Sequence, residues 1–300
     1  MTAARRVVVP APAKINLLLH VGNRRPDGYH DLESLVAFAA IGDEIELATD
    51  NGFSLSVDGP FGEGLEAGEQ NLALRAARIL ADRVGASSGV RIRLTKNVPV
   101  AAGLGGGSAD AAAVLRGLVC LWNLDPDVEM LRDAAATLGA DVPVCLTCAP
   151  AWMEGKGERI TLVSQLPAMP LLLANPGVPV PTASVFGGLR ERRGLGLVRP
   201  VAPFPDASAL VRFLQGTTND LEAPARAIAP VIGVVLDEMA GLPGLALARM
   251  SGSGATCFGL FENESLIVAA RTMLRQRHPQ WWVVATRLAF ADAASQFAVQ

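Results

Sequence analysis

The chain has 300 residues, half of them hydrophobic and 18% of them charged, so it can form two domains and bury a large core. Its net charge of −3 at pH 7, without a long basic run, argues against a protein that coats nucleic acid. No apolar run approaches the ~20 residues of a membrane-spanning helix, and none follows the N-terminal arginines as in a signal peptide. Four cysteines fit a reducing cytoplasm better than a disulfide scaffold, so we expect a soluble cytoplasmic protein.

Strand patterns dominate the first sixty residues. Unbroken or alternating apolar residues predict strands over residues 7–9, 14–21, 35–38, 44–47 and 53–57. Asn71 can cap a helix, because the apolar residues after it recur at helical spacing: Leu72, Ala76, Ile79 and Leu80. Alternation over residues 90–94 then predicts a half-exposed strand.

A glycine run precedes the next helix. We expect that helix over residues 109–121 and a second one over 128–138, which stops at Gly139, a usual helix terminator. Short apolar runs then predict strands over residues 142–146 and 151–154.

The second half is richer in predicted helices. After a buried strand over residues 171–174, we expect helices at residues 182–192, 208–215, 222–228 and 231–239. The remaining expected elements are strands over 245–250 and 256–261, a helix over 265–275 and a last strand over 281–288. Because the order has no regular βαβ period, it predicts an α+β chain with two domains, 1–155 and 156–300.

The segment Gly103–Ser108 has four glycines and leads directly into a helix. Glycines let the backbone adopt left-handed angles and approach a ligand closely, and a helix N-terminus directs free N–H groups at an anion. A P-loop would need a lysine at its end, and a dinucleotide fingerprint would need GxGxxG inside a βαβ unit; this segment has neither. It therefore predicts a phosphate-binding loop, with a merely flexible loop as the alternative.

Lysine and tyrosine are rare in this chain. Of its 26 basic residues only Lys14, Lys96 and Lys156 are lysines, and Tyr29 is its single tyrosine. The abundance of Ala, Arg and Gly suggests a coding bias that replaces Lys and Tyr wherever it can. The few that remain are expected to have roles that arginine or phenylalanine cannot fill.

Cys145 and Cys148 form a CxxC pair, a pattern known from redox and zinc sites. The strand expected over residues 142–146 would point the two side chains to opposite faces. No second CxxC and no nearby histidine supplies further zinc ligands. We therefore expect two buried structural cysteines.

Five motifs follow one another in an order that resembles the GHMP kinases, a family that includes galactokinase, homoserine kinase and mevalonate kinase. They are PAKIN, PDGYH, PVAAGLGGGS, LGADVP and SGSG, at residues 12–16, 26–30, 99–108, 138–143 and 251–254. The resemblance spans nearly the whole chain and implies ATP-dependent phosphorylation of an alcohol, with Mg²⁺. PAKIN, PDGYH and LGADVP together favour a member whose substrate is a cytidine-diphosphate-linked sugar alcohol.

The resemblance also implies a fold and a set of site residues. The N-terminal domain is expected to be similar to ribosomal protein S5 domain 2 and the C-terminal domain to be ferredoxin-like, with the active site between them. Asp141 looks like the catalytic base and Lys14 like its partner. The expected ATP contacts are Asn71, Lys96, Pro99, Val100, Ala101, Ala102, Gly103, Leu104, Gly105, Gly106, Gly107, Ser108 and Ala109. The expected substrate contacts are Asn16, Tyr29, His30, Thr182 and Phe186, and the C-terminal motif adds Gly252, Ser253 and Gly254.

The chemistry of phosphoryl transfer fits the roles of the first two residues independently. The reaction needs positioning, charge neutralisation and one group that accepts the alcohol's proton. Asp141 can accept that proton, and Lys14 beside it can hold the attacking oxygen. The alternatives are a turn residue and an edge-strand charge. Tyr29 and Phe186 could likewise be core aromatics, although Tyr29 follows a turn sequence that suits stacking on a base.

Three positions depart from the family pattern, and two points stay open: the metal ligands and the role of Arg24 and Arg25. Ala101 and Ala102 stand where glycines are frequent, and Ala109 replaces a frequent serine. Ser108 is thus the only hydroxyl of the loop that could touch phosphate or metal, and the metal ligands stay undetermined. Arg24 and Arg25 are more often a solvated pair than a diphosphate clamp.

Two other functions compete with the favoured one. A homoserine or mevalonate kinase is the nearest rival, although its substrate has no base to stack on an aromatic ring. A nucleic-acid-binding module is the rival from another class, and the acidic balance of the chain counts against it.

Overall fold

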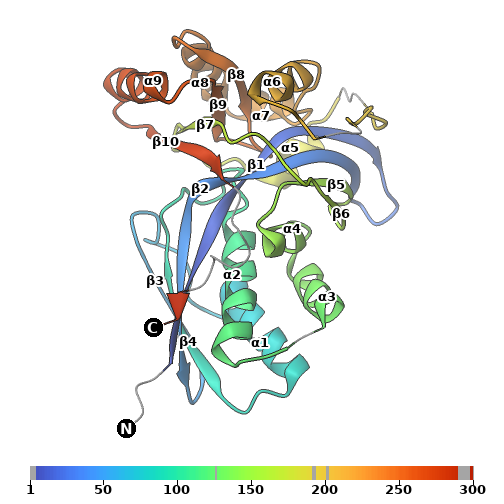
Figure 1. Cartoon of the computed structure of the whole chain (residues 1–300), viewed down its shortest axis with the longest axis vertical. Helices are drawn as coiled ribbons and strands as arrows, with labels where there is room; N and C mark the ends of the chain where they lie inside the picture. The colour runs from blue at the N-terminus through green and yellow to red at the C-terminus, as the bar shows by residue number, and fades with distance from the viewer. Residues whose placement is uncertain (1–4, 126, 191–193, 201–202, 290–297, 300) are drawn as a thin grey trace.

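The computed structural model describes residues 5–125, 127–190, 194–200, 203–289 and 298–299. Two long antiparallel strands, β1 (Arg6–Arg24) and β2 (His30–Asp50), extend through both halves of the molecule (Figure 1). The four short strands predicted for this region are parts of these two. The pairing register shifts after Pro12 and again after Asn16, and these irregularities interrupt the alternation on which the sequence pattern relies.

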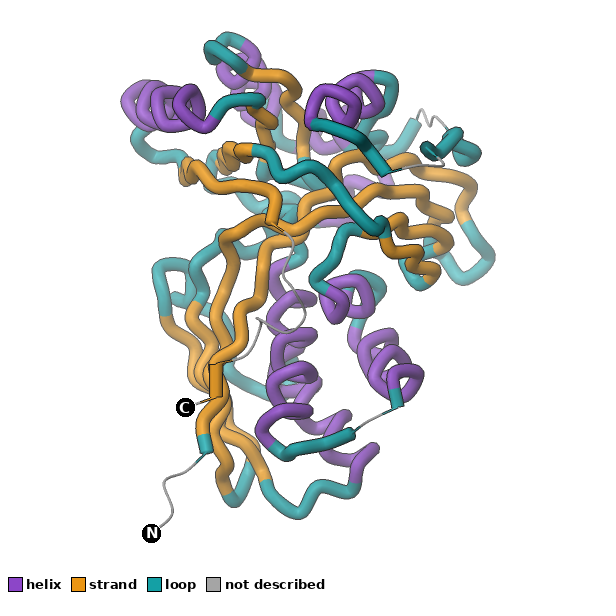
Figure 2. The backbone as a smooth tube through the Cα atoms, viewed as in Figure 1, coloured by secondary structure: helices purple, strands orange, loops and turns teal. Residues whose placement is uncertain are grey.

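The N-terminal half is a sheet with helices on one face (Figures 1 and 2). Strand β4 (Gly89–Thr95) pairs with β2 and, in parallel, with β3 (Phe53–Asp58). Helix α2 (Gly106–Leu121) has fully buried alanines, and these small side chains let it pack closely on β1 and β2. The helices of this half are α1 (Leu72–Val84), α2 (Gly106–Leu121), α3 (Val128–Leu138) and α4 (Val142–Thr147).

The C-terminal half is an antiparallel sheet with the strand order β10-β7-β9-β8. In β7, Leu171 and Leu173 pack toward β1 and β2, whereas Leu172 and Ala174 pack toward helices on the other side, so the sheet is buried on both faces. The strands are β7 (Pro170–Asn175), β8 (Leu245–Met250), β9 (Cys257–Phe261) and β10 (Trp282–Ala289). The helices are α5 (Thr182–Gly187), α6 (Ala207–Gln215), α7 (Glu222–Ile228), α8 (Val231–Ala240) and α9 (Glu264–Arg277).

The two halves share one continuous sheet. Strand β10 pairs with both β7 and β2, and β11 (Ala298–Val299) returns to pair with β1. Strands β5 (Ala151–Gly155) and β6 (Arg159–Leu162) extend the sheet from β2. The division into 1–155 and 156–300 therefore remains a proposal about domains, since strands of the second segment pair with strands of the first.

Most of the predicted elements are present, and the predicted α+β class with two differently built halves is confirmed. The strand predicted over residues 142–146 is wrong, because α4 lies there. Asp141 precedes this helix and Pro143 sits in its first turn, where proline's missing N–H costs nothing. The helix predicted over 182–192 ends at Gly187, and its last two positions lie outside the described residues.

No helix in the described part of the chain has both the length and the apolarity needed to cross a bilayer.

Candidate active site

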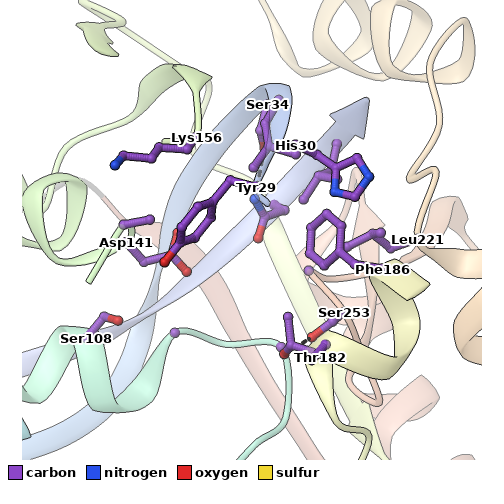
Figure 3. Close-up of a pocket in the computed structure, with 18 of the residues that line it drawn as sticks. Tyr29, His30, Ser34, Ser108, Asp141, Lys156, Thr182, Phe186, Leu221 and Ser253 are labelled. Atoms are coloured by element: carbon purple, nitrogen blue, oxygen red, sulfur yellow. Dashed lines mark hydrogen bonds between the residues drawn. The ribbon is translucent and has the colours of Figure 1, made fainter. Parts of the chain in front are cut away.

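A cleft of about 1040 Å³ lies where the glycine loop, the turn between β1 and β2, helix α5 and the C-terminal motif meet (Figure 3). Its volume is slightly above what single-ligand sites usually offer, about 300–1,000 Å³. Most of the predicted site residues line it: Lys14, Asn16, Tyr29, His30, Ala101, Ala102, Gly103, Gly105, Gly106, Gly107, Ser108, Asp141, Thr182, Phe186, Gly252 and Ser253.

The glycine loop ends in the N-terminus of α2, which begins three residues earlier than predicted. Gly105 precedes the helix with a φ of +63°, a left-handed angle that glycine adopts without strain. No side chain caps this end of α2, so its first N–H groups face the cleft without a partner from their own helix. The loop therefore presents the donors and the positive helix end that suit an anion.

The C-terminal motif closes directly onto this loop. A side chain at Gly103 would place its Cβ 2.2 Å from the carbonyl oxygen of Ser251, so only glycine permits the approach. The Oγ of Ser251 donates to the carbonyl of Gly103 (2.9 Å) and accepts from the N–H of Asn16 (3.2 Å). The hydroxyl groups of Thr182 and Ser253 form a hydrogen bond of 2.8 Å. Residues from both halves of the chain thus hold the loop in place.

Lys14 and Asp141 form an ion pair at the side of the cleft, with Nζ and Oδ2 3.0 Å apart. The Lys14 side chain is 5% exposed, whereas that of Asp141 is 39% exposed and therefore open to a ligand. Lys14 also donates to Oδ1 of Asn16 (2.9 Å), whose Nδ2 donates to Ser34 (2.8 Å). This chain of bonds fixes the ammonium group next to an accessible carboxylate.

Aromatic side chains gather at the end of the cleft formed by the β1–β2 turn (Figure 3). Tyr29 is 56% exposed, which rules out a core role for it. The Nζ of Lys156 lies 5.4 Å from the centroid of the Tyr29 ring. His30 stacks on Phe186 with their ring centroids also 5.4 Å apart. A planar, electron-rich ligand could stack here beside a cation.

Several predicted residues lie outside the cleft lining. Asn71 caps α1, its Oδ1 accepting from the N–H of Ala73 at 3.0 Å, and only its neighbour Leu72 reaches the cleft. Lys96 is buried, with 4% exposure, beneath the glycine loop. The other predicted positions absent from the lining are Pro99, Val100, Leu104, Ala109 and Gly254.

Lys156 and Ser34 line the cleft although motif reasoning did not select them. The rarity of lysine in the chain could have pointed to Lys156. Lys14 and Lys156 both line the cleft, and Lys96 lies directly behind it. Of the two adjacent arginines, Arg24 lines the cleft, whereas Arg25 is bound to Asp31 at 3.0 Å. Nothing in the sequence distinguished the two.

The CxxC pair is structural, as predicted, but for a different reason. Cys145 lies in α4 and Cys148 ends that helix, so the two side chains do not lie on opposite faces of a strand, as predicted. Both are buried free thiols, and Cys148 donates to the carbonyl of Cys145. Burial raises the pKa of both thiols, which disfavours the reactive thiolate.

In the part of the chain that the structure describes, no group of three or more His, Cys, Asp or Glu side chains could hold a metal ion on its own.

Comparison with known proteins identifies the relatives of this chain. The family model described as "GHMP kinases N terminal domain" matches residues 71–148, and "GHMP kinases C terminal" matches residues 205–280. The chain is 48% identical over 282 residues to the 4-diphosphocytidyl-2-C-methyl-D-erythritol kinase of Paramagnetospirillum magneticum, covering 93% of this chain and 98% of that protein. It is 50% identical over 278 residues to the enzyme of that name from Dinoroseobacter shibae, covering 93% of each.

Solved structures agree. A crystal structure of 4-(cytidine 5'-diphospho)-2C-methyl-D-erythritol kinase superposes with a TM-score of 0.73 at 36% identity, covering 94% of this chain and 99% of that one. A homoserine kinase from Cytophaga hutchinsonii superposes with a TM-score of 0.74, but at 18% identity it shows only the shared fold. This superposition covers 100% of this chain and 98% of the homoserine kinase, so the two proteins share the fold along their whole length.

Proposed function

The chain belongs to the GHMP kinases and, among them, to the 4-diphosphocytidyl-2-C-methyl-D-erythritol kinases, and we propose that it phosphorylates the 2-hydroxyl of 4-diphosphocytidyl-2-C-methyl-D-erythritol with ATP. This reaction belongs to the non-mevalonate route of isoprenoid precursor synthesis. The observation that carries the proposal is one cleft in which an anion-binding loop, a Lys14–Asp141 pair and a cluster of aromatic side chains adjoin.

The glycine loop is the proposed site of the ATP phosphates. The N–H groups at the start of α2 and the positive end of its dipole favour a polyanion. Left-handed backbone angles at Gly103 and Gly105 let the chain approach the phosphates without a side chain between them.

Magnesium would enter with the nucleotide. Mg²⁺ prefers oxygen ligands and usually binds through phosphates, waters and only one or two protein groups. The cleft fits that mode, because the hydroxyl of Ser108 lies at its phosphate loop and the described residues offer no complete cage of protein ligands. The ion would neutralise phosphate charge, and Ser108 is the residue that would hold it.

Asp141 and Lys14 are the proposed catalytic residues. The accessible carboxylate accepts the proton of the attacking hydroxyl, and the buried ammonium group holds the oxygen that loses it. Asn16 restricts Lys14 by accepting its hydrogen bond, so the cation is positioned before substrate arrives. Most of the catalytic advantage then comes from placing the hydroxyl in line with the transferred phosphoryl group.

The other end of the cleft suits a cytidine diphosphate. Tyr29 can stack on the pyrimidine, and the His30–Phe186 pair provides a second aromatic surface beside it. Lys156 and Arg24 supply positive charge for a diphosphate. The volume of about 1040 Å³ allows a nucleotide and a second nucleotide-sized substrate to bind together.

The proposed function is tested by measuring ATP consumption with a panel of alcohols. We expect high kcat/KM with 4-diphosphocytidyl-2-C-methyl-D-erythritol and no activity with homoserine or mevalonate. Equal activity with either of them would reject the proposed substrate and leave the kinase activity intact. A gel-shift assay at moderate salt, with no shift expected, tests the nucleic-acid alternative.

A further inference from the structure

Three ionisable side chains are buried directly beneath the glycine loop, outside the cleft. Asp43 lies on β2, Lys96 follows β4, and Asp110 lies in the second turn of α2; their residues are 2%, 4% and 3% exposed. Lys96 was expected to lie near the nucleotide; it does not line the cleft, and its ammonium group is paired with the two carboxylates. Burying charges is costly, so their position needs an explanation.

The three side chains connect the two ends of the loop. Asp43 Oδ1 accepts from the N–H groups of Asn97 (2.6 Å) and Val98 (3.1 Å), the residues by which the chain enters the loop. Lys96 donates to Asp43 and, at 2.8 Å, to Oδ2 of Asp110, just after the chain has left the loop. Residues 99–109 are therefore held at both ends through a single ammonium group.

Lys96 also supports the floor of the loop. A Cβ added to Gly106 would lie 3.3 Å from its Nζ and 3.6 Å from Oδ2 of Asp43. Gly106 is the first residue of α2 and lines the cleft on its other side. Only the backbone of the loop thus separates this cluster from the bound phosphates.

The cluster contains two carboxylates and only one ammonium group. With both carboxylates ionised it carries a net negative charge under a site for a polyanion, which is unfavourable. Asp110 is the carboxylate best suited to take a proton, since its buried Oδ1 has no hydrogen-bond partner among the described residues. Burial raises the pKa of Asp110 to about 7; Asp43 reinforces the rise and Lys96 opposes it.

The other charged groups around this part of α2 are committed elsewhere. Arg116 donates to the backbone oxygens of Cys145 and Pro10. Lys14, on β1 beyond Gly105, pairs with Asp141. The faces that α1, α3 and α4 bury are apolar. The charge balance beneath the loop is therefore set by the cluster itself.

We propose that Asp43, Lys96 and Asp110 are positioning residues that clamp both ends of the phosphate loop, and that Asp110 takes up a proton from solvent when ATP binds. The inference rests on the proposed use of this loop for ATP. The phosphates disfavour a second negative charge below them, so their binding favours the protonated form of Asp110. The affinity for ATP should therefore fall as the pH rises above 7, because Asp110 is then ionised in the free protein and must take up a proton when ATP binds.

The test is calorimetric binding of ATP, without the alcohol, to the wild type and to Asp110→Asn. The amide keeps the shape of the carboxyl and an oxygen for Lys96, but it cannot ionise. We expect wild-type affinity to fall up to about tenfold from pH 6 to pH 8.5 relative to the variant, the amount that a one-unit linked pKa shift gives. The titration of ATP itself is common to both proteins and cancels in the comparison.

Proton uptake gives a readout that a merely structural role would not change. Titrations at pH 7 in two buffers of different ionisation enthalpy should show uptake by the wild type and none attributable to the protein in Asp110→Asn. Asp127→Asn is the matched control. Position 127 is the N-cap of α3, at the other end of that helix from Asp141, and asparagine caps a helix as well as aspartate does. Equal uptake in all three proteins would overturn the proton linkage.

The clamp is tested separately through Asp43. Asp43→Ala removes the acceptor for Asn97 and Val98, so KM for ATP should rise more than tenfold while KM for the alcohol stays within about twofold. Asp43→Asn keeps an acceptor and should restore most of the ATP affinity. Equal increases in both KM values would refute a role specific to the loop. Failure of the wild type to bind ATP at all would instead contradict the proposed function.

Discussion

The substitution Asp141→Asn removes the proposed base with little other change. Asp141 precedes α4, but its side chain makes no capping hydrogen bond, so the amide should leave the helix intact. The substitution does break the ion pair of Lys14, whose Nζ lies 3.0 Å from Oδ2 of Asp141. Two effects must therefore be separated, one on stability and one on turnover.

The stability effect is expected to be small. Removing one partner from a fully buried pair costs about 3–5 kcal/mol. The Asp141 side chain is 39% exposed, however, so water can replace it, and Lys14 keeps its bond to Asn16. We expect a loss of about 1 kcal/mol or less, which for a chain of 300 residues lowers Tm by at most about 2 °C.

The effect on turnover is expected to be large. A lost general base usually costs about 10²–10⁴ in rate, or roughly 3–5 kcal/mol of transition-state stabilisation. A loose transition state would favour the lower end, since the proton of the alcohol then leaves late. ATP binding should be unchanged within about twofold, because the glycine loop does not depend on this carboxylate.

The assay combines steady-state kinetics, calorimetric ATP binding and thermal unfolding on Asp141→Asn and on Asp133→Asn. Asp133 is exposed on α3 and serves as the control for loss of one carboxylate. A kcat within threefold of the wild type in Asp141→Asn would refute the assignment of the base. A large loss of ATP affinity would show instead that Asp141 acts on the nucleotide.

Three further predictions follow from the cleft and its surroundings. Gly105→Val should weaken ATP binding about 5- to 30-fold by calorimetry, because φ is +63° there, and should spare the cytidine substrate; the reverse ranking would exchange the two half-sites. Tyr29→Ala should lower kcat/KM for the cytidine-bearing alcohol roughly 5- to 150-fold, but hardly change the residual rate with methylerythritol phosphate; equal losses would exclude stacking on the base. Iodoacetamide at pH 8 should label half-buried Cys120 before Cys145, whose thiol pKa is raised by burial; peptide mass spectrometry showing the opposite order would mean that α4 opens readily.

The sequence was most informative where one local signal decides the structure. Asn71 was predicted to cap a helix and does so, and Gly139 ends α3 as expected. The strand predicted over residues 142–146 was wrong, because a short apolar segment suits a strand and a buried helix equally. Pro143 and the packing of α4 against α2 decide for the helix, and only the proline was visible in the sequence.

The site was predictable as a set of motifs but not as a geometry. The motifs selected Lys14 and Asp141, which prove to be 3.0 Å apart, yet no spacing along the chain could show that distance. The family resemblance placed Lys96 near the nucleotide, and the structure pairs its side chain with Asp43 and Asp110. Those aspartates are 53 and 14 residues away, so only the fold brings the three together.

The activity proposed for this cleft is transfer of the terminal phosphoryl group of ATP to the 2-hydroxyl of a cytidine-bearing alcohol. The most direct measurement is the ³¹P NMR spectrum of the product formed by the wild type from ATP and 4-diphosphocytidyl-2-C-methyl-D-erythritol. Carbon 2 bears a methyl group and no hydrogen, so we predict one new phosphomonoester signal without proton splitting, beside unchanged diphosphate signals. A signal split by carbon-bound protons would place the phosphate on another hydroxyl, and inorganic phosphate alone would mean hydrolysis; either result would contradict the account.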